Sequence, residues 1–139
     1  MTEPAVPPIL PTITDLNRPF WDGCAAGVLR YQACRPAGHP RYPVSDVCPT
    51  CLSKDYDWRD ASGDAEVLSA VVFHRGYHKA YEALVPYNVA LVQLAEGPRL
   101  FSNVMPLDRR DIRAGTRVHV VFDEVASGVA IPRFAPIAE

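Results

Sequence analysis

The stretch Tyr87–Val104, YNVALVQLAEGPRLFSNV, decides the fold, because it contains two strand patterns joined by a tight turn. Along Tyr87–Ala95 the side chains alternate between two faces, and Ala90, Val92 and Leu94 share one of them. Glu96-Gly97-Pro98 is a turn sequence, since glycine permits unusual backbone angles and proline removes a ladder donor. Arg99–Val104 then resumes the strand pattern, so the stretch predicts a β-hairpin.

Three more strand patterns flank this hairpin. Glu66–His74 precedes it, and Thr116–Val125 and Val129–Phe134 follow it. In between, the polar segment Asp108–Arg113 predicts one or two helical turns. Three strands, a short helix and two strands follow one another in the order of an OB-fold, which is a five-stranded, partly open barrel. We therefore expect a mainly β protein with a five-stranded OB-fold barrel over residues 63–139.

The N-terminal part, residues 1–27, combines a proline-rich arm with one helix. Met1–Pro11 is expected to be extended, and Thr12–Gly27 is expected to be helical because its apolar residues recur at helical spacing. Two large aromatic residues, Phe20 and Trp21, lie on this helix. They have two interpretations: they pack on the core of this protein, or they dock against a partner.

Three of the four cysteines lie in the segment 28–62. Cys48-Pro49-Thr50-Cys51 is a CxxC knuckle, whose tight turn lets two thiolates reach one tetrahedral metal ion. Cys34 offers a third thiolate, but Ala37 stands where a second knuckle would have its second cysteine. His39 follows Cys34 at a C-x4-H spacing, which suits a zinc ligand. The segment thus indicates a Cys3His zinc site, and the alternative is a ribbon that has lost its metal.

Length, charge and targeting signals exclude several functional classes. The chain has 139 residues and a formal net charge of −2, which gives no electrostatic case for binding nucleic acid. No export signal and no apolar run near the ~20 residues of a membrane span are apparent. We therefore expect a cytoplasmic protein without membrane contact. Its cysteines should be metal ligands or, like Cys24, buried core residues.

Several short motifs together resemble one family by their order and spacing. They are PFWDG (19–23), GVL (27–29), CPTC (48–51), ASG (61–63), PYNVALVQL (86–94), EGPRL (96–100) and PRF (132–134). In these motifs the chain is similar to acyl-CoA-associated proteins in which an N-terminal helix and a rubredoxin-like zinc ribbon precede an OB-fold. Ala37 departs from the family pattern, which bears on the zinc and not on the fold.

The resemblance implies a non-catalytic accessory subunit that packs on an acyl-CoA-processing enzyme and helps to form its acyl-CoA site. A thiolase-like enzyme is the first expected partner, and a hotdog-fold enoyl-CoA hydratase or an aldolase comes next. The expected assembly is a hetero-oligomer, and coenzyme A thioester is the expected shared ligand.

The loop from position 74 to position 87 is the candidate for contact with a partner or with acyl-CoA. Its polar and aromatic members are His74, Arg75, Tyr77, His78, Lys79, Tyr81 and Tyr87. Tyrosine and arginine are enriched at interface centres, which favours protein contact. Alternatively, Arg75 and Lys79 meet the phosphates of coenzyme A, and a tyrosine lies against its adenine or pantetheine.

Three other functions remain alternatives at this point. The first is a stand-alone acyl-CoA-binding module. The second is an oligonucleotide-binding OB protein, which needs a basic, aromatic-lined face. The third is an enzyme that acts through His74 and His78, although the sequence has no nucleophile elbow, zinc-protease motif or phosphate loop.

Overall fold

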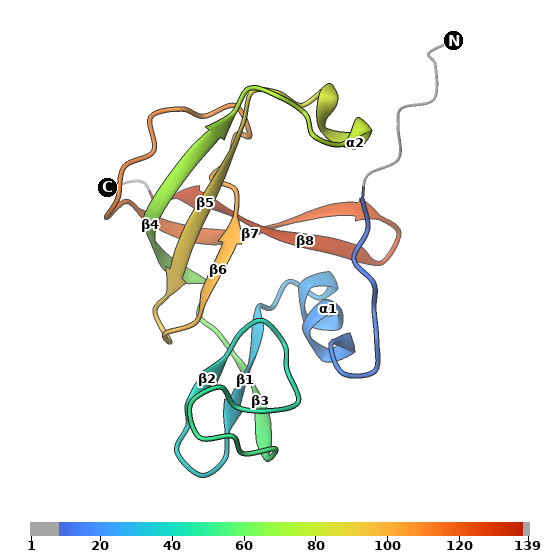
Figure 1. Ribbon diagram of the computed structural model, residues 1–139, viewed down its shortest axis with the longest axis vertical. Coiled ribbons are helices and arrows are strands. Elements are labelled where there is room, and N and C mark those ends of the chain that lie inside the picture. The colour runs from blue at the N-terminus through green and yellow to red at the C-terminus, as the bar shows by residue number, and fades with distance from the viewer. Residues whose placement is uncertain (1–8, 138–139) are drawn as a thin grey trace.

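The computed structural model describes residues 9–137, which form a β-barrel, a smaller three-stranded sheet and two short helices (Figure 1). The three-stranded sheet lies at one end of the barrel, and the N-terminal helix lies beside it. In this part of the chain no helix is long and apolar enough to cross a membrane. The predicted extended arm Met1–Pro11 falls largely outside the described residues.

Five antiparallel strands make the barrel: β4 (Asp64–Phe73), β5 (Tyr87–Leu94), β6 (Arg99–Ser102), β7 (Arg117–Ala126) and β8 (Val129–Pro136). Their order in the sheet is β6-β5-β4-β7-β8. The sheet curls until its two edges meet, where Val104 forms a parallel bridge with Phe134. The Phe134 N–H also donates to the Asn103 carbonyl oxygen at 2.9 Å. A curled sheet of five strands closed in this way is the predicted OB-fold barrel.

The hairpin predicted from Tyr87–Val104 is confirmed as β5 and β6. Ala90, Val92 and Leu94 are buried, as the alternation indicated. The Leu94 N–H donates to the Pro98 carbonyl oxygen at 2.8 Å and closes the turn.

The helix predicted over Asp108–Arg113 is wrong, because no residue of this segment is helical. The Asn88 side-chain amide nitrogen lies 3.0 Å from the Leu107 carbonyl oxygen and 3.3 Å from that of Arg109. Hydrogen bonds from a side chain to these carbonyl groups compete with the hydrogen bonds that a helix would form. The local capping signal is therefore overridden by a contact from β5.

A helical turn occurs instead inside the loop between β4 and β5, for which no helix was predicted. It is α2 (Lys79–Glu82). The ring nitrogen Nδ1 of His78 accepts the Ala80 N–H at 3.0 Å and caps the turn.

The N-terminal helix α1 (Arg18–Ala25) is shorter than the predicted Thr12–Gly27. Asn17 stands at its N-cap, but the Asn17 side-chain oxygen accepts the Thr14 N–H, at 2.7 Å, and caps no helical N–H. Gly27 has a φ of +81° and ends the helix as predicted.

The ribbon is a three-stranded sheet of order β2-β1-β3, made of β1 (Arg30–Cys34), β2 (Pro40–Arg41) and β3 (Tyr56–Asp60). Two loops leave this sheet. The first joins β1 to β2 and carries His39, and the second joins β2 to β3 and carries the CxxC knuckle.

One continuous core joins α1 to the barrel. Phe20 and Cys24 of α1 belong to the same buried cluster as Val67, Val92 and Phe134 of the barrel. The helix is therefore anchored by barrel side chains. The ribbon contributes few residues to this cluster, so it needs stabilisation of its own.

Candidate functional site

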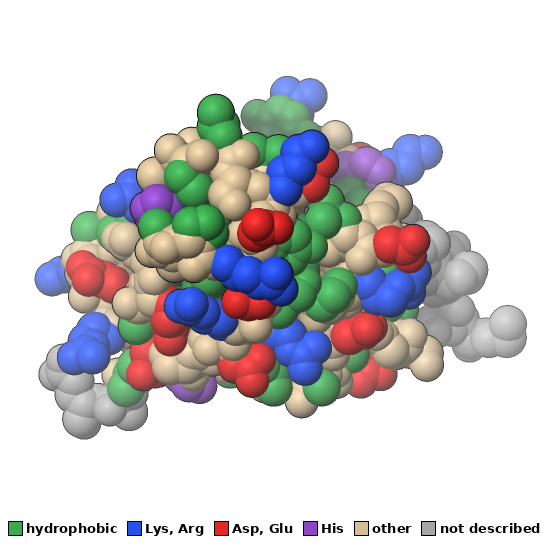
Figure 2. All heavy atoms as spheres, turned by 90° about the horizontal axis from the view of Figure 1, so that it is seen from below, with side chains coloured by type: hydrophobic (Ala, Val, Ile, Leu, Met, Phe, Trp, Pro, Cys, Tyr) green, Lys and Arg blue, Asp and Glu red, His purple; other side chains and the backbone are tan. Residues whose placement is uncertain are grey.

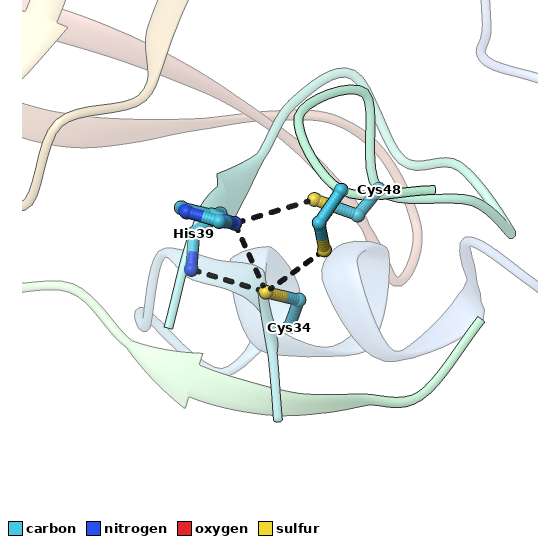
Figure 3. A group of neighbouring side chains, drawn as sticks. Cys34, His39 and Cys48 are labelled. Atoms are coloured by element: carbon cyan, nitrogen blue, oxygen red, sulfur yellow. Dashed lines mark hydrogen bonds between the residues drawn. The ribbon is translucent and has the colours of Figure 1, made fainter. Parts of the chain in front are cut away.

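Cys34, His39, Cys48 and Cys51 converge at the end of the ribbon. Cys34 is the last residue of β1, and His39 immediately precedes β2. The thiol sulfurs and a His39 ring nitrogen all lie within 4.8 Å of one another (Figure 3). The His39 Nδ1 atom is 3.4 Å from the Cys34 sulfur and 3.8 Å from the Cys48 sulfur. The sulfurs of Cys34 and Cys51 are 3.8 Å apart.

These distances fit a tetrahedral zinc ion. With bonds of about 2.3 Å to sulfur and about 2.0 Å to nitrogen, a tetrahedral site puts two sulfurs ~3.8 Å apart and a sulfur and a nitrogen ~3.5 Å apart. The observed separations lie within a few tenths of an ångström of both values. His39 could therefore supply the fourth donor atom that Ala37 cannot, and the structure brings all four predicted ligand residues together.

Backbone N–H groups point at two of these sulfurs, those of Cys48 and Cys34. The N–H of Cys51, and then that of Thr50, points at the Cys48 sulfur, and these hydrogen bonds lower the pKa of the Cys48 thiol to about 6 against the effect of burial. The His39 N–H likewise lies 3.3 Å from the Cys34 sulfur. Cys24 stands apart from this group, and burial raises the pKa of its thiol to about 12. Cys24 is buried in the cluster that joins α1 to the barrel, which confirms the sequence interpretation of Cys24 as a core residue.

The candidate loop between β4 and β5 places its tyrosines in an aromatic cluster on Phe73. The Tyr87 ring stacks on Phe73 at 5.3 Å between centroids, and Tyr77 meets Phe73 edge to face at 6.3 Å. Tyr81 lies 5.4 Å from Tyr87. The Arg75 guanidinium covers the Tyr77 ring at 5.2 Å. The structure therefore brings four of the predicted contact residues together.

The other three predicted members of this loop form none of these ring contacts. His74, His78 and Lys79 are exposed, and His78 uses its ring to cap α2. Among the described residues, no hydrogen bond joins His74 to His78, whose ring accepts the Ala80 N–H instead.

Two hollows flank α2 on the barrel. The smaller, of about 250 Å³, is lined by Phe20, Trp21 and Tyr42 among others. The larger, of about 360 Å³, is lined by Phe73 and Tyr87 among others. Both hollows share a wall made of Tyr81, Leu84, Phe101, Ser102, Asn103 and Arg133. Apolar walls with one arginine and one asparagine are typical of sites that take a mostly apolar group.

Phe20 and Trp21 differ in their accessibility. Phe20 is 3% exposed and lies in the core, so its side chain packs on this protein as the first interpretation proposed. Trp21 is half-buried, meets the Phe20 ring edge to face at 4.9 Å and faces the smaller hollow.

The outward face of β4, β5 and β6 is unusually apolar for a barrel surface. Cross-strand pairs of this face are Phe73 with Tyr87, Val71 with Val89, and Leu91 with Phe101. Phe101 is 74% exposed, and Val71 and the nearby Tyr77 and Leu84 are exposed as well. We call these residues the outer apolar face: Val71, Phe73, Tyr77, Leu84, Tyr87, Val89, Leu91 and Phe101. Contiguous apolar surface of this kind marks interaction sites.

The ribbon end of the molecule has a different character. Figure 2 shows acidic and basic side chains interspersed over that end, with small apolar areas between them. The charges do not gather there into a patch of one sign.

Sequence reasoning missed several polar residues that organise these regions. Asn88 is buried, and its side-chain nitrogen lies within 3.3 Å of four backbone carbonyl oxygens. Arg133 joins Asp123 to Asn103, and both Arg133 and Asn103 line the two hollows. In the ribbon, Gln32 and Arg41 are buried and bond to loop carbonyls. Asn88 alone carried a usable signal, because it shares the buried parity of Ala90, Val92 and Leu94.

Two family models match consecutive parts of this chain. The rubredoxin-like zinc ribbon domain of ChsH2 matches residues 21–57, and the C-terminal OB-fold domain of ChsH2 matches residues 58–123.

Similar proteins come from bacteria and archaea. A probable enoyl-CoA hydratase alpha subunit of Thermomonospora curvata is 33% identical over 91% of this chain, which spans 39% of that protein's length. A DUF35 domain-containing scaffold protein of Pyrococcus furiosus is 30% identical over 72% of this chain and 77% of its own. The solved structure of the Ltp2-ChsH2(DUF35) aldolase contains a chain that is 33% identical, with a TM-score of 0.79, over 91% of this chain and 98% of its own.

Proposed function

Since this chain belongs to the DUF35 family, with a ChsH2-type zinc ribbon followed by an OB-fold domain, we propose that it is a non-catalytic accessory subunit of an acyl-CoA-processing enzyme. Its relatives are named as scaffold proteins, as a hydratase alpha subunit and as part of an aldolase. These names support a partner of the hydratase or aldolase class, and a thiolase-like partner follows from the family resemblance. The four free thiols support a reducing compartment, the cytoplasm.

The observation that carries this proposal is the outer apolar face. Its exposed members, above all Phe101 and Tyr77, would leave water on contact with a partner. A protein partner covers such a face with its own apolar side chains, and the aromatic rings of Phe73 and Tyr87 already stack into a rigid base for it. Trp21 and the smaller hollow extend the same region toward α1.

We propose that the ribbon binds zinc and that the metal has a structural role. Cys34, His39, Cys48 and Cys51 would hold it, and three thiolates with one imidazole leave no open position for a substrate. The zinc would fix the two loops of the ribbon relative to each other. The ribbon would then present a defined surface beside α1.

Contact with coenzyme A is a second part of the proposal. The larger hollow has the size of a small ligand site and is lined by Tyr81, Tyr87 and Arg133. Arg75 and Lys79 are exposed residues of the loop between β4 and β5, which also carries Tyr81, and phosphate groups can reach them there. We infer that the acyl-CoA site is shared between this loop and the partner enzyme, because the loop residues lie on an open surface.

A pull-down with a matched pair of variants tests the accessory role. The tagged full chain is used to capture proteins from its native extract, and the prey is identified by mass spectrometry. Phe101 and Leu52 are both 74% exposed, but Phe101 lies on the outer apolar face and Leu52 directly follows the knuckle. We expect a stoichiometric acyl-CoA enzyme with the wild type and with Leu52→Asn, and its loss with Phe101→Asp.

Two outcomes decide between this function and a stand-alone acyl-CoA-binding module. Capture of no acyl-CoA enzyme, together with tight binding of coenzyme A by the lone chain in calorimetry, would overturn the accessory role. Capture that survives Phe101→Asp would instead show that the partner uses another surface.

A further inference from the structure

Arg41 is a buried cation without an acidic partner. Its residue is 1% exposed, and none of the ion pairs in the described part of the chain includes it. Its Nε–H group is buried and has no hydrogen-bond partner. Burying a charge without compensation is costly, and buried arginines are normally paired with a carboxylate. The position of Arg41 therefore calls for a source of negative charge.

The guanidinium of Arg41 bonds to the loop that carries Cys48 and Cys51. One terminal nitrogen donates to the Ser45 carbonyl oxygen at 2.9 Å, and the other donates to that of Ser53 at 3.2 Å. The Ser53 oxygen also accepts the Cys48 N–H at 2.8 Å. The guanidinium thus spans the knuckle loop from its start to its end. It lies over the Tyr56 ring at 4.7 Å, which completes its enclosure.

Gln32 holds the same loop without adding charge. Its side-chain oxygen accepts the Ser45 N–H, and its side-chain nitrogen donates to the Ser45 oxygen, both at 2.8 Å. The start of the loop is therefore already fixed by a neutral residue. A second, charged residue at this place is unnecessary for hydrogen bonding at Ser45 alone.

A Cys3His zinc centre would supply the negative charge that Arg41 otherwise lacks. Three thiolates carry three negative charges, the zinc ion carries two positive charges and a neutral imidazole carries none, so the centre has a net charge of −1. From this we propose that Arg41 is the countercharge of the zinc centre: it neutralises that charge from within the ribbon and spans the loop that holds Cys48 and Cys51. The proposal rests on zinc occupying the ribbon, as proposed above.

Zinc affinity measured on the full chain tests this role. The dissociation constant is determined by competition with a chromophoric chelator for wild type, Arg41→Gln, Arg41→Lys and Arg59→Gln. Arg59 is the matched control, because it is an exposed arginine on the same sheet. Loss of an outer-shell partner typically weakens metal binding by about 10–100-fold. We expect that loss for Arg41→Gln, a smaller loss for Arg41→Lys, and less than about a 2-fold change for Arg59→Gln.

The reduction potential of the iron-substituted ribbon separates charge from mere packing. Three thiolates give Fe(II) a net charge of −1 and Fe(III) a net charge of zero, so a nearby cation favours the reduced form. Arg41→Gln should therefore lower the potential, whereas Arg41→Lys should keep it near that of the wild type. If Arg41 acted only by packing, the potential of Arg41→Gln would not have to lie below that of Arg41→Lys.

The outcomes are distinct for each proposal. A wild-type chain that binds no zinc would overturn the proposal that the ribbon binds zinc. A wild-type chain that binds zinc while Arg41→Gln binds equally well overturns the countercharge role. If Arg41→Gln does not fold, Arg41→Met replaces it as the neutral variant. A potential of the iron-substituted Arg41→Met chain equal to that of Arg41→Lys would overturn the countercharge role, and a lower potential would support it.

Discussion

The side chain of Asn88 pairs with both backbone groups of Val104, as a neighbouring strand would. Its amide nitrogen donates to the Val104 carbonyl oxygen at 2.9 Å, and its oxygen accepts the Val104 N–H at 2.8 Å. The same nitrogen reaches the carbonyl oxygens of Pro106 and Leu107. One buried amide thus organises the whole connection from β6 toward β7.

We predict that Asn88→Ala lowers the free energy of unfolding by about 3 kcal/mol or more, because it leaves several buried backbone groups without partners. Urea denaturation followed by tryptophan fluorescence measures the loss. Gln93→Ala on the same strand is the control, since Gln93 bonds only to the Gly97 carbonyl oxygen in a half-exposed turn. A loss of no more than about 1 kcal/mol for both variants would contradict this role for Asn88.

This residue also illustrates how far sequence reasoning reaches. The parity of Ala90, Val92 and Leu94 predicted which face of β5 is buried, and Asn88 lies on that face. The local capping residues predict a helix over Asp108–Arg113, but the Asn88 side chain bonds to backbone groups just before this segment, between Val104 and Leu107, and lies 3.3 Å from the Arg109 carbonyl oxygen within it. A contact between residues about twenty positions apart decides its conformation, and no local pattern contains that information.

Gly63 connects the ribbon to the barrel in a conformation that other residues adopt with difficulty. Its φ is +91°, and a Cβ atom there would lie 2.6 Å from a methyl carbon of Val120. We predict that Gly63→Ala lowers the free energy of unfolding by about 2–4 kcal/mol, from backbone strain and steric overlap together. Gly128→Ala is the matched control, because Gly128 has a φ of +75° with open space around it, and should cost about 1 kcal/mol. If the two variants lose equal free energies of unfolding, steric overlap with Val120 does not contribute to the effect of Gly63→Ala.

The sequence predicted the group of Cys34, His39, Cys48 and Cys51 more readily than the buried polar residues around it. The spacing of Cys34, His39 and the knuckle predicted these four residues as candidate ligands, and the structure brings their donor atoms within 4.8 Å of one another. Arg41 and Gln32 carry no such spacing rule. Their bonds go to the backbone of Ser45 and Ser53, and any residue type supplies a carbonyl oxygen.

Removal of zinc should loosen the ribbon and leave the barrel intact. The ribbon shares little of the barrel core, whereas α1 is anchored in that core through Phe20 and Cys24. We predict that chelation abolishes hydrogen-exchange protection in β1 and β3, while protection in β5 and β7 persists. Exchange measured by mass spectrometry with and without a chelator checks this. His39→Ala with zinc present should reproduce the chelated pattern, and loss of protection in β5 on chelation would contradict it.

Cys48 and Cys24 are both buried, but they should differ sharply in reactivity once zinc is removed. Hydrogen bonds from Cys51 and Thr50 N–H groups lower the pKa of Cys48 to about 6, whereas burial raises that of Cys24 to about 12. Above about pH 6 Cys48 is therefore a thiolate, the form that reacts with iodoacetamide and binds metal, and below this pH it is protonated. We predict that at pH 7.5 the metal-free chain is alkylated at Cys48 well before Cys24.

Peptide mapping by mass spectrometry gives the rate at each cysteine. As the pH falls through about 6, both the alkylation of Cys48 and the zinc affinity should fall, because a proton then competes for the same sulfur. Saturating zinc should protect Cys48 at pH 7.5, and urea should release Cys24 from protection because unfolding removes the burial that raises its pKa. A Cys48 rate that rises only above pH 9 would show that the knuckle N–H groups do not stabilise the thiolate.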